Sequence, residues 1–421
     1  MGRLTILDGL RGYFLVFMFL NHLTFAGDYL LVKVNHDELG FVEGAQGFVF
    51  LSGLLAGLVH GQRALRKGFG AAAGAIWNRA AEIYAYALAC VLVILVLQTV
   101  LPGSQLYWHH WLGDLSFGRG RLVAASALLL YQPDHLDILP QYVVYLLVTP
   151  PLLWLCLRGR WPWLAAGCAV LWLAVQLGAH LPLAAAMDRI LPLRAYFNVL
   201  AWQLVFMAGL MIGVAMAQGR IDWDRLFRRD RPELAIIAAI LLLFFAVWRV
   251  WSNHFTMPEP IALRFHALAN RGEFGVVYLL NFAAAAYVVA WVIRVGPETA
   301  SSALRRLARL LQQLFNLPFL RLLGRHSLQV YAWHVIMIYL LKAVDHDWGP
   351  FDEATKTLIA VAGIALLAVP ALILERAGGF LPSLHPRPAM ADRGPGRRPR
   401  ATATGTPPRS TPSSPPSPHR R

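Results

Sequence analysis

Long apolar runs separated by short polar segments dominate the chain between residues 10 and 375. Many of these runs lie within stretches of about 20 apolar residues, the length that crosses roughly 30 Å of hydrocarbon as a helix. The pattern predicts ten membrane-spanning helices, near residues 10–27, 43–61, 80–101, 141–157, 163–181, 199–218, 233–251, 274–294, 325–343 and 355–375. We therefore predict an all-α, polytopic integral membrane protein.

The composition supports a membrane protein, since 57% of the 421 residues are hydrophobic and 14% are charged. The net charge of +15 is distributed unevenly. Basic residues gather in alternate loops (residues 63–79, 158–160, 220–231 and 305–321), and the loops between them are acidic or mixed. Because Lys and Arg are retained in the cytoplasm, we predict that these loops and both termini are cytoplasmic. The basic excess then sets topology and does not indicate nucleic acid as a partner.

The end of the chain has a different composition from the rest. Residues 382–421 contain eleven prolines and eight arginines, with many Ser and Thr and few apolar side chains. Such a segment cannot bury a core. We predict a membrane-embedded domain over residues 1–380 and a disordered cytoplasmic tail over residues 381–421.

The first predicted helix contains polar groups that are costly in a membrane. Arg11 and His22 are eleven residues apart, which is nearly three helical turns and places both on one face, about 16 Å apart along the axis. Arg11 could hold an anionic cytosolic ligand, while His22 transfers a proton near the outer end. Alternatively, Arg11 snorkels to the interface beside Asp8, and His22 is a hydrogen-bonded core residue. Asn21 precedes His22 and is a further candidate for the pocket.

The second predicted helix opens with polar residues and continues with glycines. Glu43 and Gln46 can share a face at its outer end, and Ser52 follows. Gly53, Gly57 and Gly61 repeat every four residues and favour close approach of another helix. If this helix packs on the first, Glu43 or Gln46 comes near His22.

Two other predicted helices contribute candidate pocket residues. Ser327, Tyr331 and His334 follow i, i+4, i+7 spacing and line one stripe of the ninth helix. Asn198 and Gln203 stand at the outer start of the sixth helix. Each set could bind substrate or form hydrogen bonds between helices.

The outer loop between residues 102 and 140 is rich in aromatic and acidic residues. Trp108, Asp114 and Asp137 are candidates for binding a carbohydrate, whose C–H faces stack on aromatic rings and whose hydroxyls need acceptors. An interfacial aromatic belt is the alternative for Trp108. The loop histidines lack a recognisable metal-ligand spacing, so we predict no bound metal.

Several dispersed motifs resemble one known family. Asp8-Gly-Leu-Arg11-Gly with His22 resembles the signature of the membrane acyltransferase family 3. Four further stretches are similar to its OpgC branch, the family of osmoregulated periplasmic glucan succinyltransferases: residues 47–53, 137–142, 197–204 and 324–334.

The resemblance implies an enzyme of ten spans in the bacterial inner membrane that transfers succinyl groups to periplasmic glucans. It implies a cytosolic acyl-CoA, succinyl-CoA in the first instance, as co-substrate and no bound cofactor. It also implies that His22 is the general base, or a proton shuttle, and that Arg11 positions the donor. Glu43 is the candidate carboxylate partner of His22. From the residues alone, a transporter or flippase with a polar path through the bundle is the alternative function.

Overall fold

The computed structural model describes residues 5–27, 29–34, 36, 40–256 and 258–378. The predicted outer-loop acids Asp28, Asp37 and Glu38 lie outside these residues, as does the predicted tail. Contacts divide the chain into one unit, Met1–Glu375, and a second unit that begins at Arg376.

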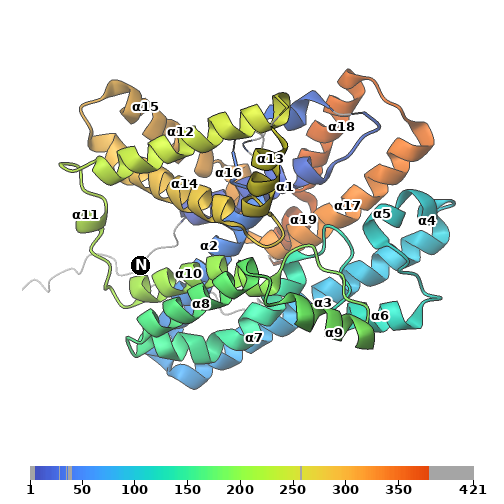
Figure 1. Ribbon diagram of the computed structural model, residues 1–421, viewed down its shortest axis with the longest axis horizontal. Helices are drawn as coiled ribbons and strands as arrows, with labels where there is room; N and C mark the ends of the chain where they lie inside the picture. The colour runs from blue at the N-terminus through green and yellow to red at the C-terminus, as the bar shows by residue number, and fades with distance from the viewer. Residues whose placement is uncertain (1–4, 28, 35, 37–39, 257, 379–421) are drawn as a thin grey trace, which may run out of the picture. The chain divides into compact units, whose positions relative to one another are not determined.

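The described residues form helices and no strand (Figure 1). The α-helices are α1 (Thr5–His22), α2 (Gly44–Lys67), α3 (Phe69–Val100), α4 (Ser104–Tyr107), α5 (His109–Leu112), α6 (Gly120–Ala127), α7 (Ile138–Leu157), α8 (Trp161–Gln176), α9 (Leu181–Ile190), α10 (Val199–Ala217), α11 (Trp223–Leu226), α12 (Glu233–His254), α13 (Glu259–Leu268), α14 (Val276–Val295), α15 (Ser302–Phe315), α16 (Pro318–Arg325), α17 (Ser327–Trp348), α18 (Glu353–Leu366) and α19 (Val369–Gly378). Residues 30–34 and residues 296–298 each form a short 3₁₀ helix.

The prediction of an all-α, polytopic membrane protein is confirmed. Within the described part of the chain, eight helices are long and apolar enough to cross a membrane, with α18 and α19 together counted as one. They match eight of the ten predicted spans. The predicted span at 163–181 is instead the pair α8 and α9, bent by 77° and a ninth span if the pair is counted as one. The predicted span at 10–27 is α1, whose 18 residues include Asp8 and Arg11 and which is not among the helices counted as apolar enough to cross.

Glycines bring α2 and α10 into backbone contact. A Cβ on Gly53 or Gly57 of α2 would lie 2.0 Å or 2.2 Å from the backbone oxygen of Phe206 or Leu210 in α10. Gly213 of α10 is equally close to α2, with the Leu54 oxygen 2.1 Å from the position of a Cβ. The two helices lie side by side (Figure 1). The repeated glycines therefore have a packing role, as the sequence predicts, and their partner is α10.

A second glycine contact joins α1 to the segment before α17. A Cβ on Gly9 or Gly12 would lie within 2.0 Å of the backbone oxygen of Phe315 or Leu320, respectively. A Cβ on Gly324 would collide with the Asp8 carbonyl in the same way. Gly9 thus allows the end of α15, and Gly12 allows α16, to lie directly against α1.

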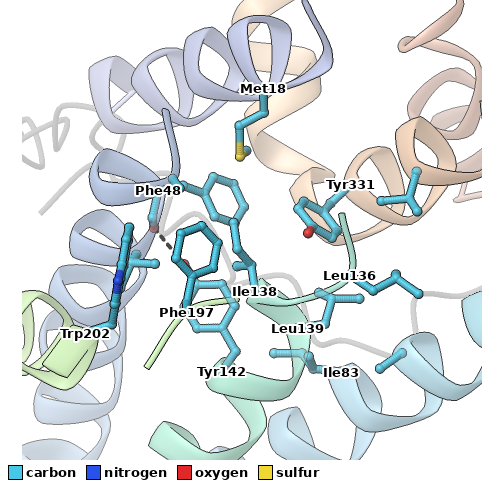
Figure 2. Close-up of a cluster of buried hydrophobic side chains, with 14 of the residues drawn as sticks. Met18, Phe48, Ile83, Leu136, Ile138, Leu139, Tyr142, Phe197, Trp202 and Tyr331 are labelled. Carbon is cyan, nitrogen blue, oxygen red and sulfur yellow. Dashed lines mark hydrogen bonds between the residues drawn. The ribbon is translucent and has the colours of Figure 1, made fainter. Parts of the chain in front are cut away.

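Side chains from four helices meet in a buried hydrophobic cluster. Met18 of α1, Phe48 of α2, Ile138 of α7 and Tyr331 of α17 point toward one another (Figure 2). The Tyr142 hydroxyl donates a hydrogen bond to the Phe48 carbonyl, at 2.8 Å. The ends of these helices are thereby held at fixed positions.

We predict that Gly57→Ala lowers the thermal unfolding midpoint of the detergent-solubilised protein, because the new Cβ overlaps the α10 backbone. Overpacking of this kind costs about 1–3 kcal/mol. Gly74→Ala in α3 is the matched control, since nothing lies within 4 Å of its added Cβ. An equal midpoint for wild type and Gly57→Ala would contradict the backbone contact.

Candidate functional site

A polar cavity of about 350 Å³ lies where helix ends and their connecting segments meet. It is enclosed by the end of α1, the start of α2, the segment leading into α7, the residues before α10 and α14, and one residue each of α12 and α17. Its lining residues are Met18, Asn21, His22, Val32, Glu43, Gly44, Ala45, Asp134, His135, Asp137, Ile138, Tyr196, Phe197, Arg249, Arg271 and Tyr331. Most of these elements end on the side that the sequence predicts to face outward.

A chain of hydrogen bonds fixes the chemistry of His22. Its Nδ1 lies 3.1 Å from Nε2 of His334, whose own Nδ1 lies 2.5 Å from the Tyr331 carbonyl oxygen. A carbonyl only accepts, so Nδ1 of His334 carries the proton, and its neutral ring accepts at Nε2. His22 then donates from Nδ1. Its Nε2 then keeps the lone pair.

His135 lies against the other side of the His22 ring. The ring centroids are 4.3 Å apart, and Trp111 meets the His135 ring edge-on at 4.9 Å. The Tyr331 hydroxyl donates to the His135 carbonyl, at 2.6 Å. His135 has a φ of 71°, a strained conformation for a residue with a side chain and one that is enriched at functional sites. Burial, followed by the charges of His334 and Arg271, lowers the pKa of His135 to about 3, so the ring is neutral.

Two polar atoms on the part of the cavity wall that leads into α7 are buried without hydrogen-bond partners. They are Nε2 of His135 and Oδ1 of Asp137, neither of which forms a hydrogen bond within the described structure. Burial, and then the charge of Asp134, raises the pKa of Asp137 to about 7. Unpartnered polar atoms at a cavity wall are costly unless a ligand binds them.

Two arginines lie on the cavity wall, and sequence reasoning did not single out either. Arg271 pairs with Glu43, with 2.5 Å between Nε and Oε2, and its charge is stacked over Tyr196 and Phe197. Arg249 of α12 lies over the Phe41 ring, at 5.2 Å. Glu43 lines the same cavity as His22, but the rings that contact His22 are those of His334 and His135.

Several predicted pocket residues make contacts that organise the helices. Gln46 is fully buried and binds the Phe41 carbonyl, and Asn198 caps α10 by accepting from the Leu200 amide. Gln203 donates to the Cys168 carbonyl of α8, at 2.9 Å. Ser52 lies near the Tyr142 hydroxyl, and Ser327 is buried at the start of α17.

The loop candidates separate into three environments. Trp108 is fully buried and donates to the Tyr339 carbonyl, at 3.1 Å. Asp114 lies at the surface, 3.8 Å from Arg119. Asp137 alone of the three lines the cavity. Asn21 lines it as well.

The donor candidates lie at the other end of α1. Arg11 is stacked over the Phe48 ring, at 5.3 Å, and Asp8 is 8% exposed beside Gly324. Eleven residues, or nearly three turns of α1, thus separate Arg11 from His22.

The fold is a bundle of helices long enough to cross a membrane, and ionisable side chains line a polar cavity at the helix ends. The protein is therefore a polytopic membrane protein with an internal polar site. The chain belongs to the OpgC protein family, because the model of that family matches residues 3–378. Comparison with curated proteins and with solved structures finds no match for this chain. Membership of the family supports a role as a glucan-modifying acyltransferase.

We predict that Glu43→Ala lowers the free energy of unfolding by about 1–2 kcal/mol. The loss is smaller than for a fully buried ion pair, because the Arg271 side chain is partly exposed. A double-mutant cycle with Arg271→Ala, followed by thermal unfolding in detergent, measures the coupling. Additive effects of the two substitutions would show that the pair contributes no interaction energy.

Proposed function

We propose that the protein transfers an acyl group, succinyl in the first instance, from acyl-CoA to a hydroxyl of an extracytoplasmic glucan. The observation that carries the proposal is the directed chain from the Tyr331 carbonyl through His334 to His22. It leaves Nε2 of His22 as an unprotonated base at a cavity of about 350 Å³. Pockets of this size accommodate small ligands.

The chemistry is a single acyl exchange. Nε2 of His22 removes the proton from the acceptor hydroxyl while its oxygen attacks the thioester carbonyl. The carbon–sulfur bond then breaks, and the departing thiolate takes the proton back from His22. The products are an oxygen ester and free CoA. His334 stabilises the positive charge that forms on His22 during the transfer, as the orienting partner of a catalytic histidine does.

The acceptor hydroxyl binds to the part of the cavity wall that contains His135 and Asp137. Nε2 of His135 and Oδ1 of Asp137 are buried without hydrogen-bond partners, and both residues line the cavity with His22. Sugar hydroxyls both donate and accept, so a ring nitrogen beside a carboxylate matches them. The apolar rings of Tyr196 and Phe197 offer faces on which a sugar can stack.

The donor enters from the cytoplasmic end of α1. Arg11 binds an anionic group of CoA there, and His22 lies about 16 Å further along the helix. Acyl-CoA is cytosolic and the glucan is outside, so an inner-membrane protein with reacting groups inside the bundle satisfies both locations.

We expect His22→Ala to abolish acylation, because a positioned general base contributes about 10²–10⁴-fold to the rate. The measurement is CoA release and product mass from purified protein supplied with succinyl-CoA and a glucan. Thermal unfolding of the variant controls for folding. Wild-type rates in a folded His22→Ala variant would exclude the general-base role.

A pair of variants tests the orienting role of His334. His334→Gln keeps an acceptor for the Nδ1–H of His22, whereas His334→Leu removes it. We expect His334→Gln to retain more of kcat than His334→Leu, with KM for the acceptor similar in both. If the two variants lose kcat equally, the tautomer of His22 does not depend on this hydrogen bond.

Asp137 gives the reaction a pH dependence. Its pKa is raised to about 7, so its ionised form, which accepts from two hydroxyls, becomes the major form above that pH. Activity therefore rises as the pH increases through about 7, and Asp137→Asn removes this rise. Asp347→Asn, at an exposed carboxylate, is the matched control. An unchanged profile in Asp137→Asn would contradict this assignment.

A further inference from the structure

Arg249 is a cation that lacks an ion-pair partner in the described part of the chain. It stands near the end of α12, one of the helices able to cross the membrane, and it lines the cavity that contains His22. No described acidic side chain forms a salt bridge with it, and its buried Nε has no hydrogen-bond partner. An ionisable residue in a spanning helix is costly unless it is paired, so it is a functional hypothesis by default.

Arg271, unlike Arg249, has an acidic partner on the cavity wall. Arg271 neutralises Glu43 on the same wall, with 2.5 Å between Nε and Oε2. That carboxylate is therefore already engaged. Of the other carboxylates on the wall, Asp134 pairs with Arg194, and Asp137 forms no salt bridge with Arg249 within the described residues, so Arg249 keeps an unpaired positive charge.

We propose that Arg249 binds the free carboxylate of a dicarboxylic acyl group while His22 acts at the other end of that group. This inference rests on the proposed function and deepens it by naming the residue that selects the acyl group. A guanidinium binds a carboxylate through two parallel hydrogen bonds. The ring of Phe41 holds the Arg249 side chain in place by stacking beneath its charge.

The arrangement also explains how a neutral acyl group is rejected. An uncharged chain of equal length leaves the Arg249 charge unpaired in the cavity, and a site that leaves a buried polar group unpaired discriminates strongly. Selection thus acts through Arg249, whereas the proton transfer at His22 is indifferent to the far end of the chain.

The test compares succinyl-CoA with butyryl-CoA, which has the same number of acyl carbons and no carboxylate. Equilibrium binding of each thioester to purified full-length protein is measured without acceptor, and acyl transfer is then measured with a glucan. We expect Arg249→Gln to weaken succinyl-CoA binding by about 10–100-fold, the range for a charge-assisted hydrogen bond. Butyryl-CoA binding stays within about twofold of wild type, and Arg249→Lys is intermediate.

Arg264→Gln is the matched control, since Arg264 is exposed on α13 and does not line the cavity. Thermal unfolding confirms that each variant is folded. An Arg249→Gln variant that binds both thioesters as the wild type does, or loses both equally, overturns the proposal. Equal loss of transfer from both donors, with donor binding intact, would mean that Arg249 serves a carboxylate on the acceptor, and this also overturns it. If the wild type binds succinyl-CoA through Arg249 and transfers nothing, the proposed function fails and this inference stands.

Discussion

The site depends on how closely the backbone of α1 approaches the segment that leads into α17. Gly9, Gly12 and Gly324 allow this approach, because a Cβ at any of them would overlap a carbonyl of the facing chain. Backbones in direct contact cannot slide past one another without collision, so the height of α1 relative to α17 is fixed. That height is what brings His22 level with His334. A glycine motif at the cytoplasmic end of α1 thus determines the geometry of a histidine about three turns away.

The position of the histidines decides their charge as well as their contact. In a bundle, a histidine that must carry charge needs a counter-ion, and the chain from Tyr331 to His22 contains none. Both rings are therefore neutral before the reaction. The Tyr331 carbonyl at the end of the chain determines which nitrogen of each ring carries the proton. Neutrality suits a base, which must begin unprotonated. Arg271 reinforces it, since a cation beside the site disfavours a second positive charge.

Much of the fold and part of the site are predictable from sequence. Eight spans follow from apolar length alone, and the glycine spacing of α2 indicates a tightly packed partner. The break between α8 and α9 is not visible in the hydropathy, since both halves are apolar. His334 and Tyr331 are predictable as a stripe, but their pairing with His22 joins residues more than 300 positions apart and depends on packing. Arg249 could have been found, because an arginine lies within the predicted span at 233–251. Arg271, in a connecting segment, has no comparable signal.

The cavity assigns different tasks to groups of different charge. Neutral histidines lie beside the reacting centre, where a proton must move in both directions at little cost. Permanent cations lie further along the wall, where a fixed charge can select a ligand and never titrates. A lone arginine is tolerated at this position because the cavity is polar and roomy enough to hold water when no ligand is bound. A carboxylate that displaces the water gains a full charge pair, whereas a methyl group gains nothing. The same constraint that makes a charge expensive inside a membrane therefore makes it an effective selector of its substrate.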